Sequence, residues 1–138
     1  LDLAVGKAVR CYDGRPSDAP LRGRFKVLSL SGGVLPLHGP MTQGHTVRLG
    51  PSAGVEIEGM RIHLVSGKCQ MLDLDLFRFL GVQPEQMKLL VVKSSVHFRA
   101  AFAPVASHIL VAAAPGPMAA DPAALPWTQL PPGIARAP

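Results

Sequence analysis

The sequence lacks the features that mark most nucleic-acid-binding and membrane proteins. Its 14 Lys and Arg residues are scattered without a basic run, and aromatic residues make up only 5% of the chain. Proteins that bind nucleic acids usually combine a basic stripe with aromatic side chains that stack on bases. No apolar run approaches the roughly 20 residues that a membrane-spanning helix needs. We therefore expect neither a nucleic acid nor a membrane as partner, although the net charge of +5 suits an anionic ligand.

Cysteine is equally scarce. The chain has only Cys11 and Cys69, which lack the CxxC spacing of redox and zinc motifs. A chain of 138 residues buries enough apolar surface to fold without a covalent link. We therefore expect both cysteines to be reduced, small core residues of a cytoplasmic protein, with a disulfide between them as the alternative. The absence of a signal-peptide pattern at the start of the sequence also favours the cytoplasm.

Motifs for nucleotide and metal binding are missing as well. The sequence contains neither a P-loop nor a dinucleotide-binding fingerprint, and its five histidines form no HExxH or HxH pair. A zinc site needs three or four ligands brought together, and nothing in the spacing predicts such a set. We therefore expect no metal in this chain. His63 alternates with Ile62 and Leu64, which places it on the polar face of a strand.

The first half of the chain has the pattern of a β-rich structure punctuated by glycine. A loop is expected at residues 11–23, which are rich in Gly, Pro and Asp. Glu58-Gly59 fits the tight turn of a hairpin. The pattern as a whole is typical of an antiparallel meander or a small barrel. Alternating apolar and polar residues predict strands over 1–7, 24–31, 45–50, 53–59 and 60–67.

After Cys69 the pattern predicts helix, strand, helix and strand, which makes the whole an α+β domain. Asp73 is placed to cap a helix over 74–81, and Gly81 stands where a helix-ending glycine belongs. Pro84 opens a short turn. The run "KLLVVK", residues 88–93, is continuously apolar, as is typical of a strand covered on both faces.

The remaining elements lie beyond this apolar run. Ser95 is placed to cap a helix over 96–103, and "SHILVAAA", residues 107–114, predicts a second buried strand. Residues 115–138 are rich in proline and alanine and predict an extended tail, pinned by Trp127. We expect residues 1–138 to form a single domain. Leu1 stands in place of an initiator methionine and begins in the middle of a strand pattern, so we expect the chain to be a piece of a larger protein.

One short segment concentrates polar side chains at the predicted end of a strand. Two cations, two hydroxyls and an imidazole in seven positions could hold an anion or a substrate carboxylate. The alternative is that a serine caps the helix and the cations are merely solvated. The candidate site residues are Lys93, Ser94, Ser95, His97 and Arg99.

The same segment carries a resemblance. "LLVVKSSVHFRAAFAPVASHILVAAAPGPMAADPAALPWTQL", residues 89–130, resembles the C-terminal domain of the microcystinase C (MlrC) family of zinc metallopeptidases. The glycine pattern of "GGVLPLHGPMTQGHTVRLGPSAGVEIEGMRIHLVS" and the segment "DLDLFRFLGVQP" also resemble that domain. The resemblance covers essentially the whole chain, and the KSS-x-HFRA motif is long and unusual.

The resemblance implies a division of labour between two domains. The zinc ligands of the family would lie in an N-terminal domain that is absent here, so this chain would hold no cofactor of its own and would not hydrolyse a peptide alone. Its partner would be that N-terminal domain of the same parent protein, and a homo-oligomer is also compatible with the sequence. Lys93 to Arg99 would face the substrate cleft. The alternative is a purely structural or oligomerisation domain without a direct role in catalysis.

Overall fold

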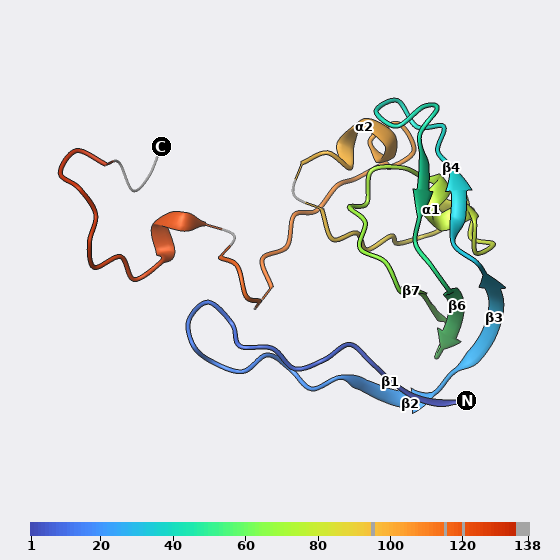
Figure 1. Ribbon diagram of the computed structural model, residues 1–138, viewed down its shortest axis with the longest axis horizontal. Helices are drawn as coiled ribbons and strands as arrows, with labels where there is room; N and C mark the ends of the chain where they lie inside the picture. Colours follow the sequence, from blue (N-terminus) through green and yellow to red (C-terminus); the bar gives the residue numbers. More distant parts are fainter. Residues whose placement is uncertain (95, 115, 120, 135–138) are drawn as a thin grey trace. The chain divides into compact units, whose positions relative to one another are not determined.

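The structure, a computed structural model, describes residues 1–94, 96–114, 116–119 and 121–134 (Figure 1). The chain divides into two compact units, which are described separately. The first unit comprises Leu1–Asp2 and Arg24–Ile109, and the second comprises Leu3–Gly23 and Leu110–Pro138. Small antiparallel sheets and a few short helices make up the secondary structure, so the fold is broadly α+β, as predicted.

A three-stranded antiparallel sheet is the centre of the first unit. It contains β3 (Lys26–Ser31), β6 (Ser52–Ile57) and β7 (Met60–Val65), in the order β3-β6-β7. The predicted tight turn between β6 and β7 is confirmed, since Glu58 and Gly59 have positive φ angles of 49° and 78°. Two consecutive positive φ values give the turn type whose twist matches that of the flanking strands.

Two further strand pairs complete the β-structure. The pair β4 (Val34–Pro36) and β5 (Thr46–Arg48) is inserted between β3 and β6 in the chain. The pair β1 (Asp2–Val5) and β2 (Leu21–Arg24) lies at the start of the chain. The alternation of the sequence predicted β1 and β5 but missed β2 and β4. The loop predicted over 11–23 was therefore too long, since its last three residues belong to β2.

Helix α1 (Asp75–Arg78) lies within the predicted range 74–81 but has only four residues, and Leu74 rather than Asp73 stands in its capping position. Asp73 still supports the start of the helix. The carboxylate of Asp73 accepts a hydrogen bond from the N–H of Asp75 at 2.9 Å. At the other end, Gly81 has a positive φ of 85°. Its N–H donates to the carbonyl of Arg78, and the N–H of Val82 donates to that of Phe77, which is the Schellman pattern. A 3₁₀ turn, Pro84–Gln86, follows.

Two apolar clusters form the core of the first unit. One consists of the buried residues Leu35, Leu37, Leu49 and Leu76. The other is built on α2 (Arg99–Phe102), from which Ala101 and Phe102 pack together with Phe98. Phe98 and Phe102 therefore share the core face, as their spacing predicts.

The two strands predicted for the second half are absent, and this prediction was wrong. Residues 88–94 and 107–114 have no regular secondary structure, and none of them joins a sheet or makes a backbone hydrogen bond to another strand among the described residues. In residues 88–93 only Leu90 and Val92 pack on the second cluster, while Leu89 and Val91 are 77% and 82% exposed. A strand needs a paired neighbour, and the described part of the chain supplies none here.

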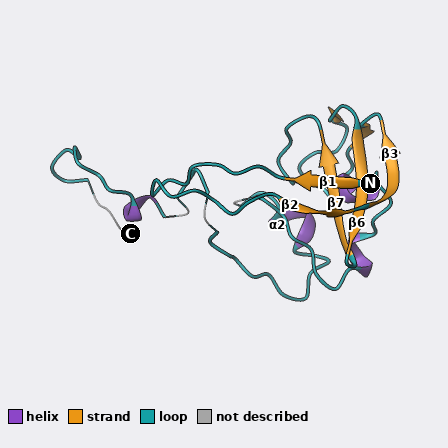
Figure 2. Ribbon diagram, turned by 90° about the horizontal axis from the view of Figure 1, so that it is seen from below, coloured by secondary structure: helices purple, strands orange, loops and turns teal. Residues whose placement is uncertain are grey.

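The described part of the C-terminal tail contains two short turns, of which one is the hydrogen-bonded turn at residues 131–134. A 3₁₀ turn, Pro122–Ala124, begins after Asp121, whose carboxylate accepts a hydrogen bond from the N–H of Ala123 at 2.9 Å. Trp127 donates its indole N–H to the carbonyl of Pro122 at 2.8 Å, so the contact is local to the tail. Loops and turns, teal in Figure 2, account for most of the trace after β7.

Both cysteines are free, but only one lies in a core. Cys11 is buried, whereas Cys69 is exposed, so the predicted core position of Cys69 was wrong. Partial burial of its thiol nevertheless raises the pKa of Cys69. Among the described residues, no helix has the length and apolar character to cross a membrane.

Candidate functional site

Four of the five predicted site residues lie in the described part of the chain, and a glutamine links two of them. Gln70 donates from its amide nitrogen to the hydroxyl of Ser94 at 3.3 Å, and the same nitrogen lies 3.1 Å from Nδ1 of His97. Ser94 is half-buried and His97 is exposed. No sequence signal identifies Gln70, because it lies more than 20 positions before both partners.

The two cations of the segment are placed differently. Lys93 is exposed. Arg99 is also exposed, and its guanidinium lies 5.3 Å from the centre of the Phe98 ring, a cation–π arrangement that holds it against the core helix. The structure therefore brings Ser94 and His97 together through Gln70. It gives Lys93 no partner among the described residues.

The predicted helix cap needs a correction. Helix α2 starts at Arg99 rather than at residue 96, and Phe98 stands in the capping position without a side-chain hydrogen bond. The preceding residues form a turn in which Arg99 donates its N–H to the carbonyl of Val96. Ser95, the residue expected to cap the helix, lies outside the described residues.

A second polar group joins α1 to the glycine-rich loop, residues 37–45, which connects β4 to β5. The Oδ2 atom of Asp75 accepts the backbone N–H of His38 at 3.0 Å and lies 2.7 Å from Nδ1 of the same residue. Arg78 donates to Oδ1 of Asp75 at 3.1 Å and also pairs with Glu85. Burial acts to raise the pKa of Asp75, but hydrogen bonds from His38 and Arg78 outweigh it and lower the pKa.

This pair has a chemical use in principle. The charged carboxylate fixes the orientation of the His38 ring, whose side chain is 71% exposed. An imidazole oriented by a carboxylate through one nitrogen keeps the other for a proton or a metal ion. The two residues are 37 positions apart, so sequence reasoning had no means of pairing them.

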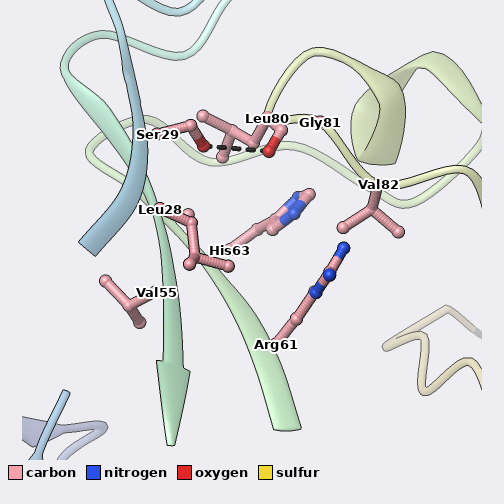
Figure 3. A pocket seen from close by; sticks show the side chains of 9 residues that line it. Leu28, Ser29, Val55, Arg61, His63, Leu80, Gly81 and Val82 are labelled. Atoms are coloured by element: carbon pink, nitrogen blue, oxygen red, sulfur yellow. Dashed lines mark hydrogen bonds between the residues drawn. The ribbon is translucent and has the colours of Figure 1, made fainter. Parts of the chain in front are cut away.

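The third arrangement is a pocket of about 250 Å³ beside the central sheet (Figure 3). Arg61 and His63 on β7 line one part of the pocket, and Val82, in the segment after α1, lines another. His63 is half-buried against the rings of Phe77 and Phe79, with ring centres 5.5 and 6.1 Å away. This burial lowers the pKa of His63, which is therefore neutral at pH 7. The sequence predicts His63 on the polar face of a strand. The structure instead half-buries the ring between two aromatic side chains and the sheet.

A catalytic spacing that sequence reasoning missed occurs at residues 50–54. "GPSAG" matches the GxSxG pattern of hydrolase nucleophiles, whose serine stands on a sharp turn between a strand and a helix. Ser52 instead begins β6, is only 5% exposed, and donates its hydroxyl to the carbonyl of Gly50 at 2.8 Å. The arrangement is therefore a structural turn and not a nucleophile.

The described residues do not form a ligand set for zinc. No group of three or more His, Cys, Asp or Glu side chains among them is arranged to hold a metal ion. The carboxylate of Asp75 is already engaged by His38 and Arg78. We therefore derive no catalytic step through a metal held by this part of the chain.

Comparison with known proteins places the chain in a family. None of the curated proteins compared with it matches. A crystal structure of a candidate metallopeptidase from Mesorhizobium sp. BNC1 has the same fold, with a TM-score of 0.74 and 24% sequence identity. The match covers 96% of this chain but only 26% of the other, so the chain spans about a quarter of that protein's length. The family described as the MlrC C-terminus matches residues 1–129, and the chain therefore belongs to that family.

Proposed function

We propose that this chain is the C-terminal domain of a longer, cytoplasmic, zinc-dependent peptidase or amidohydrolase, and that it shapes the substrate cleft of that enzyme. The family match over residues 1–129 carries the proposal. The size of the Mesorhizobium protein, of which this chain covers 26%, supports a parent with a further large domain. That N-terminal domain would hold the zinc ion and would be the partner of this chain.

The polar segment is the part of this chain that we assign to the cleft. Lys93 would supply a positive charge for a substrate carboxylate or an oxyanion. His97, held by Gln70, would orient a polar group of the substrate. Ser94 shares the same glutamine, so the two side chains are positioned as a unit. Ser95 and Arg99 complete the segment, Ser95 from sequence alone.

A second function, that of a purely structural or oligomerisation domain, is favoured by one observation. Leu89 and Val91 present apolar side chains to solvent from a segment that makes no backbone hydrogen bond to another described residue. Such a segment can accept a neighbouring strand from another domain or from a second copy. If this function is the correct one, the polar segment only satisfies local hydrogen bonds.

A paired hydrolysis assay tests the proposal. The full-length parent and the 138-residue chain are incubated with zinc and a panel of peptides and N-acyl amides. We expect hydrolysis by the parent, its loss on chelation, and none by the chain alone. Hydrolysis by the chain alone, or an inactive parent that binds zinc, would contradict the proposal. Light scattering on the chain tests the oligomerisation part of the second function, which requires a dimer or a larger assembly.

A further inference from the structure

We propose that the pocket beside β7 is a binding site for a small carboxylate that carries a branched aliphatic group. The pocket combines one guanidinium with several aliphatic side chains, and all of its lining residues belong to the first unit of the fold. This inference does not depend on the role of the chain in a hydrolase.

The pocket exists because a glycine stands at the centre of a row across the sheet. Ser29, Gly54 and His63 are aligned on β3, β6 and β7. A Cβ atom at Gly54 would meet Oγ of Ser29 at 2.6 Å and the carbonyl oxygen of Leu80 at 3.4 Å. Without that atom, the segment after α1 can approach the sheet, and Ser29 donates its hydroxyl to the carbonyl of Leu80 at 2.9 Å (Figure 3).

The charge of the pocket selects an anion. Arg61 extends toward Val82 with its guanidinium in the pocket (Figure 3). Its nearest carboxylate among the described residues is that of Glu56, the cross-strand neighbour, at 3.8 Å from Nε. That distance is too long for a hydrogen bond, so the two terminal nitrogens can still form the paired bonds that a guanidinium makes with a carboxylate.

The walls define the rest of the ligand. Leu28 and Val82 are aliphatic, and His63 presents a ring that is neutral at pH 7, because burial lowers its pKa. A volume of about 250 Å³ is below the range of drug-sized ligand pockets and suits a short branched chain. Two sources share this chemistry, a free branched-chain carboxylic acid and the C-terminal aliphatic residue of a peptide.

Titration of the chain followed by NMR tests the site. Isovalerate is the first probe, and isovaleramide, which has the same shape without the charge, is its control. We expect saturable shifts of the Arg61 side-chain and His63 ring signals with isovalerate, with a dissociation constant on the order of millimolar, and none with isovaleramide. N-acetylglycyl-leucine and its amide form the second arm. Tighter binding of this peptide than of isovalerate identifies a peptide C-terminus as the ligand, and weaker binding identifies a free acid.

Three variants separate the site from a general effect of charge. Arg61→Met should weaken isovalerate binding about tenfold or more, since it removes a charge-assisted pair of hydrogen bonds. Glu56→Gln should strengthen binding roughly twofold to fivefold, because it removes the competing carboxylate. Arg48→Met, at an exposed position on β5 outside the pocket, should leave binding unchanged.

Several results would overturn the proposal. These are the absence of saturable shifts, equal binding of isovalerate and isovaleramide, and unchanged binding in Arg61→Met. If Arg61→Met fails to fold, Glu56→Gln still tests the site. This variant should fold, because glutamine has nearly the shape of glutamate and Glu56 makes only a long contact with Arg61, at 3.8 Å. Weaker binding in Glu56→Gln would also contradict the site.

Discussion

Thr42 and Asp73 form a buried hydrogen bond between the glycine-rich loop and the start of α1. The hydroxyl of Thr42 donates to Oδ2 of Asp73, and the two residues are 4% and 1% exposed. The same oxygen accepts the N–H of Gly39 at 2.6 Å, and Oδ1 accepts that of Asp75 at 2.9 Å. A single carboxylate therefore satisfies donors from two segments more than 30 residues apart.

Replacing this carboxylate should be costly. Asp73→Ala leaves the backbone N–H groups of Gly39 and Asp75 without a partner, at about 1–3 kcal/mol each. It also leaves the Thr42 hydroxyl with only its long contact to the carbonyl of Gly39 at 3.5 Å. We expect a loss of roughly 3 kcal/mol or more in the free energy of unfolding, measured by urea denaturation. Asp18→Ala, at an exposed position, is the control and should change stability by less than about 0.5 kcal/mol. Equal stability of the two variants would mean that the carboxylate does not hold the loop.

A pair of neighbouring glycines offers a sharper comparison. Gly33 has a positive φ of 69°, and a Cβ atom there would lie 2.0 Å from the carbonyl oxygen of Gly50. Gly32 has no atom within 4 Å of the corresponding position. Gly33→Ala should therefore cost several kcal/mol or prevent folding, while Gly32→Ala should change stability by about 0.5 kcal/mol or less. Thermal denaturation of both variants checks the difference, and a well-folded Gly33→Ala would contradict the close approach.

The contacts of Asp75 predict a dependence of stability on pH. Its carboxylate is held by His38 and Arg78, and its folded-state pKa lies below the ordinary value of 3.8. The stabilisation is therefore fully present above about pH 4 and is lost as the pH falls through the folded-state pKa. The stability difference between the native chain and Asp75→Asn should be large at pH 6 and should shrink below pH 4. Urea denaturation at several pH values measures it, and a difference independent of pH would contradict the ion-pair contribution.

The polar segment is tested in the full-length parent. Lys93→Ala and His97→Ala should each lower turnover by about 100-fold, the usual effect of removing one preorganised group from an active site. Both side chains are exposed, so the melting temperature should stay within a few degrees. Lys88→Ala, also exposed and five residues earlier, is the control for loss of a charge. Normal turnover in both variants, or unfolding of both, would make the segment structural.

The β6–β7 hairpin of the central sheet could be predicted because neighbouring residues alone specify it. Alternation over β6 and β7, with Glu58-Gly59 between them, specifies a hairpin without reference to the rest of the chain. The helix end at Gly81 is local in the same sense. The apolar run at 88–93, however, only predicts where a strand can form, because pairing requires a partner that composition does not identify.

The candidate sites were harder to predict for a related reason. Lys93, Ser94, His97 and Arg99 were found because they are close in the sequence. The link through Gln70, the pairing of His38 with Asp75, and the approach of Val82 to Arg61 each join segments that only the fold brings together. A single sequence contains no signal for such contacts.

Two adjacent valines test whether the outer face of residues 88–93 is covered in the parent. Val92 packs on the cluster around Phe98, whereas Val91 is 82% exposed. In the 138-residue chain, Val92→Ala should cost about 1 kcal/mol, while Val91→Ala should cost less than about 0.5 kcal/mol. If the N-terminal domain of the parent covers this face, Val91→Ala should become as costly there as Val92→Ala. Chemical denaturation of the four proteins gives the comparison. If Val91→Ala is neutral in the parent as well, the outer face of residues 88–93 is not buried there.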